Sequence, residues 1–199
     1  MELISIPGAE VYYDACFLPP AEATALFETL LSKGTWDRRK GMFGHDVPRD
    51  EAYYGDSGTA YTYSRREYRP LSWIAELLLL KSRVEEATPT AAYSNLHFPR
   101  TGYNAALCNL YRDGNDSVGL HADAEPEMGP IIASVSLGAE RLFRMRRNGG
   151  EIVFARKLAH GSLLIMAGET QKNFRHEAPK EPKVSEARIN LTFRRVTGE

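Results

Sequence analysis

The second half of the sequence is a succession of short apolar stretches separated by turn residues. From residue 103 onward, turn signals such as RDGND, NGGE, HGS and APKEPK interrupt the chain at short intervals. The expected strands span residues 104–111, 118–123, 131–138, 141–147, 151–159, 162–168 and 188–196. Short strands at this spacing are typical of a β-sandwich or jelly roll. This half of the chain therefore predicts a β core.

The first half predicts helices in front of that core. Residues 2–17 favour one or two short strands, a helix follows Pro19-Pro20 and ends at Gly34, and a second helix is expected over residues 71–87. The apolar stripes of these helices are expected to be Ala25, Leu26, Leu30 and Leu31 in the first, and Trp73, Leu77, Leu80 and Val84 in the second. Helices followed by a β-rich half indicate an α+β fold, and 199 residues suit a single domain.

Charge and cysteine content limit the possible functions. The net charge is −1, so the molecule as a whole has no polyanion-binding character, and any nucleic-acid contact must come from a local patch. Cys16 and Cys108 are far apart and have no metal-binding spacing, which indicates reduced thiols. No signal peptide or membrane span is visible. We therefore expect a cytoplasmic protein, nucleoid-associated in a prokaryote or nuclear in a eukaryote, with no membrane partner. We also expect it to be a monomer.

Residues 35–69 have the composition of loops and hairpins. Phe43 lies in a GMFG segment, Arg49 follows a proline, and alternation places Tyr61 and Tyr63 on one face of a strand. These rings could belong to the core or its rim, or could form a lid that stacks on a flat ligand such as a base. The expected organisation is strands and helix at 1–34, lid at 35–69, second helix and loop at 70–102, and β core at 103–199.

His121 and Asp123 are the first candidates for chemistry. If they lie on a strand, both side chains point to one face and can bind the same metal ion. A third ligand must come from elsewhere, and His176 is the candidate, with His160 before Gly161 as the alternative. Two histidines and one carboxylate form the facial triad of non-haem Fe(II) oxygenases. A surface His–Asp pair without a metal is the other interpretation.

The segment 188–194 alternates strictly between polar and apolar residues. The polar face carries Arg188, Asn190, Thr192 and Arg194, and the apolar face carries Ile189, Leu191 and Phe193. The two arginines lie about 20 Å apart at the usual strand rise, and a short dicarboxylate could bridge them because guanidinium groups bind carboxylates bidentately. Asn109 and Tyr111 also alternate on an expected strand and could donate to the same ligand. A solvated strand face is the alternative.

Several segments together resemble a known family. NLYRDGNDSVGLHADAE, PIIASVSLGAERLF, LAHGSLLIMAG, RHEAP and RINLTFRRV resemble the AlkB family of Fe(II)- and 2-oxoglutarate-dependent nucleic-acid dealkylases. VPRDEAYYGDSG and YTYS extend the resemblance toward the branch that includes the duplex-DNA repair enzyme of animals. The resemblance covers residues 41–196 and implies a double-stranded β-helix (jelly-roll) core with N-terminal helices and a nucleotide-recognition lid.

The resemblance implies a role for each matching position. The iron ligands would be His121, Asp123 and His176, and the 2-oxoglutarate contacts would be Asn109, Tyr111, Arg188, Asn190 and Arg194. Substrate contacts would be Phe43, Arg49, Tyr61, Tyr63 and Glu125, with Phe43 near the place of an aromatic finger that enters the base stack. His160 matches the family's HG turn rather than a ligand. The finger loop is shorter, and AAYSNLHFPRTG longer, than in close relatives, which leaves the choice between duplex and single strand open.

The implied reaction is oxidative demethylation of N-alkylated bases in DNA, with RNA as a further candidate substrate. 1-Methyladenine and 3-methylcytosine are cationic, so tyrosine faces and the Glu125 carboxylate would suit them, although a loop carboxylate is more often only solvated. Arg141, Arg144, Arg146 and Arg147 could contact phosphates or form a solvated strand rim. The alternative functions are a 2-oxoglutarate oxygenase acting on protein or a small molecule, and a non-catalytic binding module.

Overall fold

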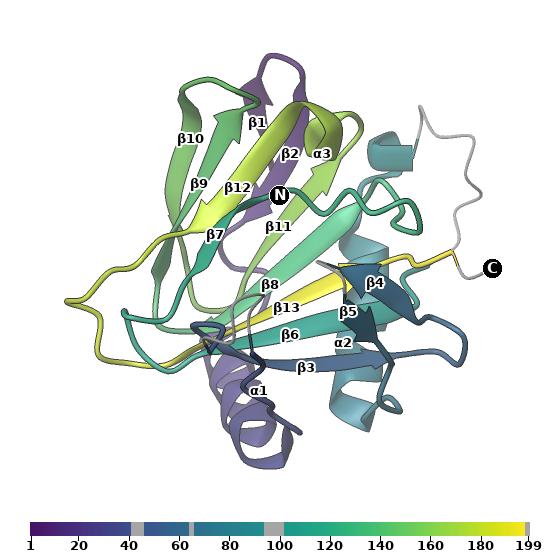
Figure 1. The fold of residues 1–199 in the computed structure, drawn as a ribbon, viewed down its shortest axis with the longest axis vertical. Helices are drawn as coiled ribbons and strands as arrows, with labels where there is room; N and C mark the ends of the chain where they lie inside the picture. The colour runs from purple at the N-terminus through teal and green to yellow at the C-terminus, as the bar shows by residue number, and fades with distance from the viewer. Residues whose placement is uncertain (41–45, 64–65, 94–101, 198–199) are drawn as a thin grey trace.

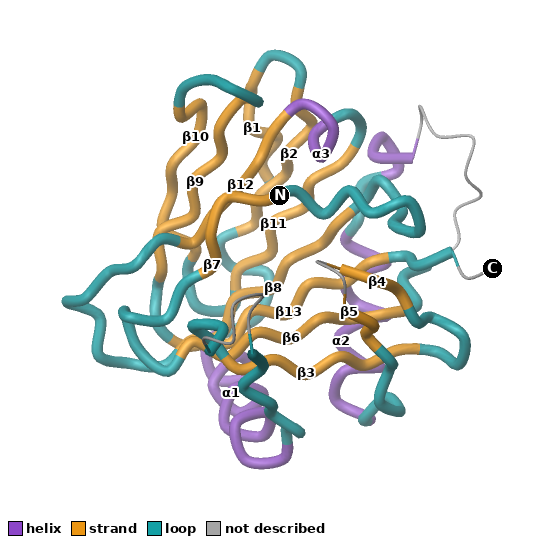
Figure 2. The backbone as a smooth tube through the Cα atoms, viewed as in Figure 1, coloured by secondary structure: helices purple, strands orange, loops and turns teal. Residues whose placement is uncertain are grey.

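A computed structural model describes residues 1–40, 46–63, 66–93 and 102–197, so Phe43 lies outside the described residues. Within these ranges the backbone forms a seven-stranded sheet, a four-stranded sheet and a two-stranded hairpin (Figures 1 and 2). The helices are α1 (Pro20–Lys33), α2 (Ala75–Ala87), the short α3 (Thr170–Asn173) and a 3₁₀ turn at Thr90–Tyr93. No helix in this part of the chain combines the length and apolar character needed to cross a membrane.

The strands pair antiparallel within each sheet. The large sheet has the order β1-β2-β11-β8-β13-β6-β3, and the small sheet has the order β10-β9-β12-β7. The large-sheet strands are β1 (Glu2–Ile6), β2 (Ala9–Asp14), β3 (Asp50–Gly55), β6 (Ala105–Tyr111), β8 (Ile132–Gly138), β11 (Ser162–Ala167) and β13 (Arg188–Arg194). The others are β7 (Val118–His121), β9 (Arg141–Arg147), β10 (Ile152–Leu158) and β12 (Phe174–Ala178), with the hairpin β4 (Tyr61–Tyr63) and β5 (Arg66–Tyr68). The predicted jelly-roll architecture is confirmed.

One face of the large sheet is covered by α1 and α2 (Figure 1). The apolar alternate residues of β13 belong to this layer, and Ile189, Leu191 and Phe193 are all fully buried in it. On α1 the buried residues are Ala23 and Leu30. Of the predicted α1 stripe, Leu30 is buried and Leu26 packs against the core. Leu31 is 42% exposed and Ala25 is also exposed, so the prediction was wrong for these two residues.

The second helix begins later than predicted. It starts at Ala75, and Trp73 therefore precedes it in extended chain, where its indole Nε1 donates to the Asp56 carboxylate at 2.7 Å. The predicted stripe of Leu77, Leu80 and Val84 is buried as expected. The indole N–H of Trp73 therefore has a polar partner although the residue lies outside the helix.

The other face of the large sheet looks toward the small sheet. Apolar residues from both sheets fill one part of the space between them, including Val11, Ile132, Met145, Leu164 and Phe174. The remaining part is polar. Because side chains alternate across a strand, β13 supplies the apolar layer with one set of residues and this polar interior with the other.

Two segments differ from the sequence expectation. Residues 50–55, expected in the lid, pair with β6 as the edge strand β3 of the large sheet. Residues 174–178, which are not among the expected strands, form β12 and carry His176. Both errors have one physical cause: these strands carry charged and polar residues whose burial is made possible by partners distant in sequence.

Gly114 marks the place where two loops interlock. Its amide donates to the Val184 carbonyl at 2.7 Å, and its carbonyl accepts from the Glu181 amide at 2.8 Å. A Cβ atom at Gly114 would lie 1.8 Å from the Glu181 carbonyl oxygen. Only glycine fits this contact without a backbone shift.

We expect Gly114→Ala to lower the free energy of unfolding by about 1–3 kcal/mol, because overpacking forces backbone displacement. Gly119→Ala is the matched control, since a Cβ there would meet no atom within 4 Å, and it should change stability by less than about 0.5 kcal/mol. Urea unfolding of both variants measures the difference. Equal effects of the two substitutions would contradict the close approach.

Candidate metal centre and its pocket

Three side chains from the small sheet and its following loop converge at one point. His121 ends β7, Asp123 lies two residues later, and His176 on β12 is the cross-strand partner of His121. Each residue offers one ligand atom, and these three atoms all lie within 4.8 Å of one another. Among the described residues, these three form the cluster that could hold a metal ion. Two imidazole nitrogens and one carboxylate oxygen are a donor set that fits Fe(II).

Both histidines can offer a neutral nitrogen. His121 Nδ1 lies 2.8 Å from the Gly119 carbonyl, and because a carbonyl can only accept, Nδ1 is the donor and Nε2 is left as the possible metal ligand. Burial is the main cause that lowers the pKa of His176, to about 3. His176 is thus neutral at physiological pH, the form that binds metals.

Asp123 is held from two sides. Arg194 lies 3.4 Å from its Oδ1, and the Asp123 amide donates to Gln171 Oε1 at 3.0 Å. Burial alone would raise the pKa of the Asp123 carboxyl, but nearby positive charge, led by that of Arg194, outweighs burial and lowers this pKa. The carboxylate is therefore ionised. Gln171 was missed in the sequence because nothing there links it to residue 123.

The polar face of β13 is confirmed by its register. Arg188 lies opposite Tyr111 of β6, and Asn190 lies opposite Asn109. On the other side β8 contributes Ser136 opposite Asn190, and Ser134 opposite Thr192. The sequence analysis missed these serines, although their alternation in an otherwise apolar strand was a usable signal.

Arg188 is a buried cation with a donor to spare. Its side chain donates from one terminal nitrogen to Ser136 Oγ at 2.9 Å and Asn190 Oδ1 at 2.8 Å. Its Nε is buried without a hydrogen-bond partner among the described residues, and burial lowers the pKa of its guanidinium. A dicarboxylate fits this environment because one of its ends can satisfy both the charge and the open donor.

Most of the predicted site residues line one pocket. These are Arg49, Tyr61, Asn109, Tyr111, His121, Asp123, His176, Arg188, Asn190 and Arg194. Glu125 lies outside this lining set, and burial together with the negative charge of Asp123 raises the pKa of its carboxyl. The backbone of Tyr63 lies in β4, and its side chain falls outside the described part of the structure.

Tyr61 forms an inner wall of this pocket. It is 3% exposed, stacks on Tyr68 with ring centroids 5.1 Å apart, and its hydroxyl accepts from Arg194 at 3.3 Å. Tyr53 packs edge-on against both rings. Tyr61 is therefore a buried aromatic that also lines the pocket, and its stacking on a base stays a prediction.

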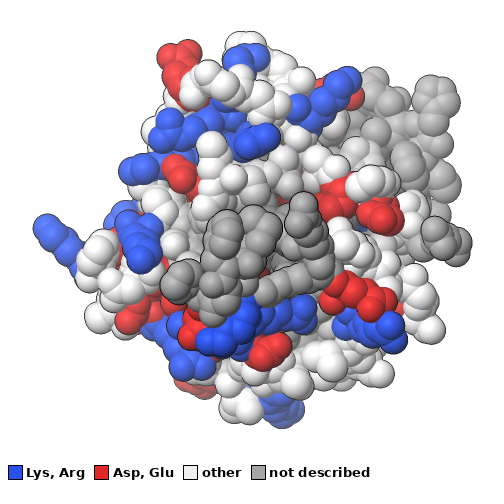
Figure 3. Space-filling view, viewed as in Figure 1, with Lys and Arg blue, Asp and Glu red and all other residues white. Residues whose placement is uncertain are grey.

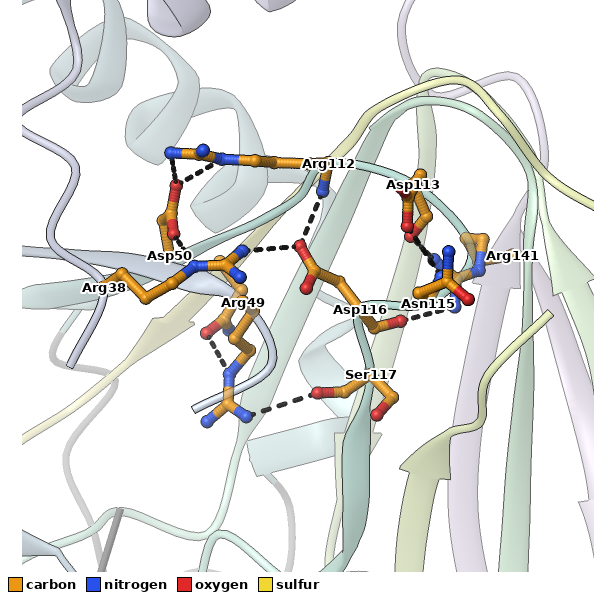
Figure 4. A network of polar contacts seen from close by, with 10 residues as sticks. Arg38, Arg49, Asp50, Arg112, Asp113, Asn115, Asp116, Ser117 and Arg141 are labelled. Carbon is orange, nitrogen blue, oxygen red and sulfur yellow. Dashed lines mark hydrogen bonds and ion pairs between the residues drawn. The ribbon is translucent and has the colours of Figure 1, made fainter. Parts of the chain in front are cut away.

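Arg49 is engaged with the protein itself. Its Nε donates to Asn109 Oδ1 at 2.9 Å, and its terminal nitrogen lies 2.7 Å from the buried Glu51 carboxylate. It also reaches the Ser117 carbonyl at 3.5 Å (Figure 4). Arg49 therefore connects the segment before β3 with the pocket residue Asn109.

A buried acid next to Arg49 fixes the position of β3. Asp50 is 1% exposed and accepts from Arg38 at 2.6 Å and from Arg112, while Arg38 also pairs with Asp116 at 2.9 Å (Figure 4). These ion pairs connect β3 to the loop between β6 and β7. His160 is not part of the site: its Nδ1 accepts from the Gly138 amide at 2.8 Å and its Nε2 lies 3.1 Å from Thr24, which confirms its structural role.

Known proteins share this arrangement. The family model described as the 2OG-Fe(II) oxygenase superfamily matches residues 10–194. The chain belongs to this superfamily. It is 40% identical to bovine alpha-ketoglutarate-dependent dioxygenase alkB homolog 3 over 195 residues, covering 90% of this chain and 64% of the relative. It is 35% identical to the human DNA oxidative demethylase ALKBH2 over 209 residues, covering 97% of this chain and 76% of the relative.

These relatives show that this chain belongs to the AlkB family within the superfamily, as the sequence motifs predicted. The chain spans less than two thirds of the length of the bovine alkB homolog 3 it matches. Among solved structures, OsALKBH1 superposes with a TM-score of 0.68 at 18% identity over 98% of this chain and all of that chain. A prolyl hydroxylase from Trichoplax adhaerens gives 0.64 at 12% identity, over 94% of this chain and 83% of that one. At these identities the superpositions establish the fold alone.

We expect Mn(II), a redox-stable substitute for Fe(II), to raise the melting temperature of the wild-type protein, because a ligand that binds only the folded state stabilises it. His176→Ala should abolish this shift. His160→Ala is the matched control and should retain it, since His160 contacts Gly138 and Thr24. Thermal unfolding with and without Mn(II) decides the matter: a shift preserved in His176→Ala would exclude the triad as the metal site.

Proposed function

We propose that the protein oxidatively demethylates N-alkylated bases, with 1-methyladenine and 3-methylcytosine in DNA as the first candidates and RNA as the next. The observation that carries this proposal is the His121–Asp123–His176 group beside a buried Arg188 with an open donor. The AlkB-family relatives support the substrate class, since one is named a DNA oxidative demethylase.

The triad would hold Fe(II), and the polar face of β13 would hold 2-oxoglutarate. Arg188, together with Tyr111 and Asn190, offers a cationic and hydrogen-bonding surface for a carboxylate. When bound, the iron supplies oxidation of a C–H bond by dioxygen, coupled to the conversion of 2-oxoglutarate to succinate and carbon dioxide. Arg194 keeps Asp123 ionised and oriented, and Arg49 keeps Asn109 oriented.

The substrate chemistry balances without further reagents. Hydroxylation of the N-methyl carbon gives an N-hydroxymethyl base, whose C–N bond then breaks to release formaldehyde and the unmodified base. One oxygen atom of dioxygen ends in the hydroxyl group and the other in succinate. The burial of Arg188 and Asn190 limits water at the cosubstrate.

The base would enter beside Tyr61 and Glu125. A base inside a duplex cannot reach a buried pocket, so it must be flipped out, and a lesion that cannot pair is easier to extrude. Both candidate lesions carry a positive charge, which suits the tyrosine stack and a half-buried carboxylate such as that of Glu125. The aromatic finger at Phe43, the base contact of Tyr63 and the cytoplasmic location stay predictions.

The direct test is turnover of oligonucleotides containing 1-methyladenine or 3-methylcytosine, in single- and double-stranded form. We expect formaldehyde and succinate in equal amounts from the wild type and none from His121→Ala, because the variant lacks an iron ligand. No formaldehyde from either lesion in either form would contradict the proposal. Succinate production triggered by peptides but not by oligonucleotides would favour the alternative oxygenase. The ratio of duplex to single-strand turnover in Phe43→Ala tests the finger.

A second experiment tests the base-binding side. Glu125→Gln should raise the KM for the methylated oligonucleotide on the order of tenfold, because a charged hydrogen bond to a cationic base is lost. The KM for 2-oxoglutarate should not change. Glu127→Gln, a half-buried acid two residues further on, is the control and should leave both values unaltered. Equal effects of the two variants would remove Glu125 from the substrate site.

A further inference from the structure

Arg141 differs from the other arginines of β9 because its side chain is buried. Basic residues gather on the outer surface over β9, β10 and β12 (Figure 3), where Arg144 and Arg146 flank Glu177 at 3.7 and 3.8 Å. Arg141 is instead 1% exposed. The suggestion that it contacts phosphate is therefore wrong, and its charge serves the interior of the protein.

The Arg141 guanidinium connects two loops. It donates to the carbonyls of Asp113 at 2.9 Å and Asp116 at 2.8 Å in the β6–β7 loop. It also donates to the Pro179 carbonyl at 2.8 Å and to Glu181 Oε2 at 3.1 Å in the β12–β13 loop. A planar fork of donors can satisfy acceptors on both sides at once, which a single ammonium group cannot do.

These loops carry the cosubstrate residues at their ends. Tyr111 ends β6 just before the first loop, and Arg188 begins β13 just after the second. Glu181 Oε2 also accepts the Leu142 amide at 2.7 Å, so the second loop is attached to β9 by both the side chain and the backbone. Arg141 thus links the loop that follows β6 to the loop that precedes β13, next to the point where Tyr111 and Arg188 are paired.

The Tyr111 ring lies near two guanidinium groups. The Cζ atom of Arg141 is 5.6 Å and that of Arg188 is 5.2 Å from its centroid. Arg141 has Glu181 as its counterion, whereas Arg188 makes no ion pair with the described acidic residues. Glu181 therefore neutralises the first cation and leaves the second as the anion-binding charge of the pocket.

We propose that Arg141, held by Glu181, is a positioning residue for 2-oxoglutarate, which orients Tyr111 and Arg188 toward the distal carboxylate of the cosubstrate. This inference rests on the proposed function. Arg141 is not among the residues that line the pocket, so it acts through its neighbours and not by touching the cosubstrate.

The test compares Arg141→Lys with Arg147→Lys, the same substitution at an exposed position of the same strand. Calorimetry measures the binding of 2-oxoglutarate and, separately, of 2-oxopentanoate to the Mn(II)-loaded protein. 2-Oxopentanoate has a methyl group in place of the distal carboxylate of 2-oxoglutarate. Arg141→Lys should weaken the binding of 2-oxoglutarate on the order of tenfold, as for other residues that orient ligands. It should leave the affinity for 2-oxopentanoate and the KM for the oligonucleotide unchanged. Arg147→Lys should change none of them.

The possible outcomes separate the two proposals. Wild-type protein that binds no 2-oxoglutarate would overturn the proposed function and this inference with it. If the wild type and Arg141→Lys bind 2-oxoglutarate equally tightly, the inference alone is overturned. Equal losses for both keto acids would assign Arg141 a merely structural role. If Arg141→Lys does not fold, Glu181→Gln serves instead and should weaken 2-oxoglutarate selectively by several-fold, with equal affinity to wild type counting against the inference.

Discussion

Two opposite charges buried side by side, Asp123 and Arg194, set the conditions for the rest of the site. Neither could be buried alone, because an isolated ion in the interior is strongly disfavoured. Arg194 keeps the pKa of Asp123 low, while burial lowers the pKa of His176. The protein thus presents an ionised carboxylate and a neutral imidazole before any metal arrives. Metal ligands must reach this protonation state in any case, so little proton release has to accompany binding.

The strand β13 contributes one set of side chains to the apolar layer and the other set to the pocket. Ile189, Leu191 and Phe193 pack under the helices, and the residues between them face the pocket. A shift of its pairing by one residue would exchange the two sets and place guanidinium groups in the apolar layer. Stability and chemistry therefore depend on one register, which pairing on both sides, with β6 and with β8, enforces.

Much of this could be predicted from local patterns. Alternation identified the two faces of β13, and the two-residue spacing identified His121 and Asp123 as neighbours. The third ligand could not be decided from the residues alone, because the choice between His160 and His176 depends on strand pairing. The structure decides it through the pairing of His176 with His121. Alternation along β9 places Arg141 on the buried side with Phe143 and Met145. The acceptors of its guanidinium could not be predicted, because they lie in loops distant in sequence.

Cys108 shows one consequence of the two-faced sheet. It precedes the pocket residue Asn109, yet alternation places its sulfur in the layer beneath the helices. Burial raises the pKa of the Cys108 thiol, which keeps it protonated. Sulfur oxidation requires thiolate character and access. The backbone of β6 therefore separates the Cys108 sulfur from the pocket, although the next residue along the strand, Asn109, lines it.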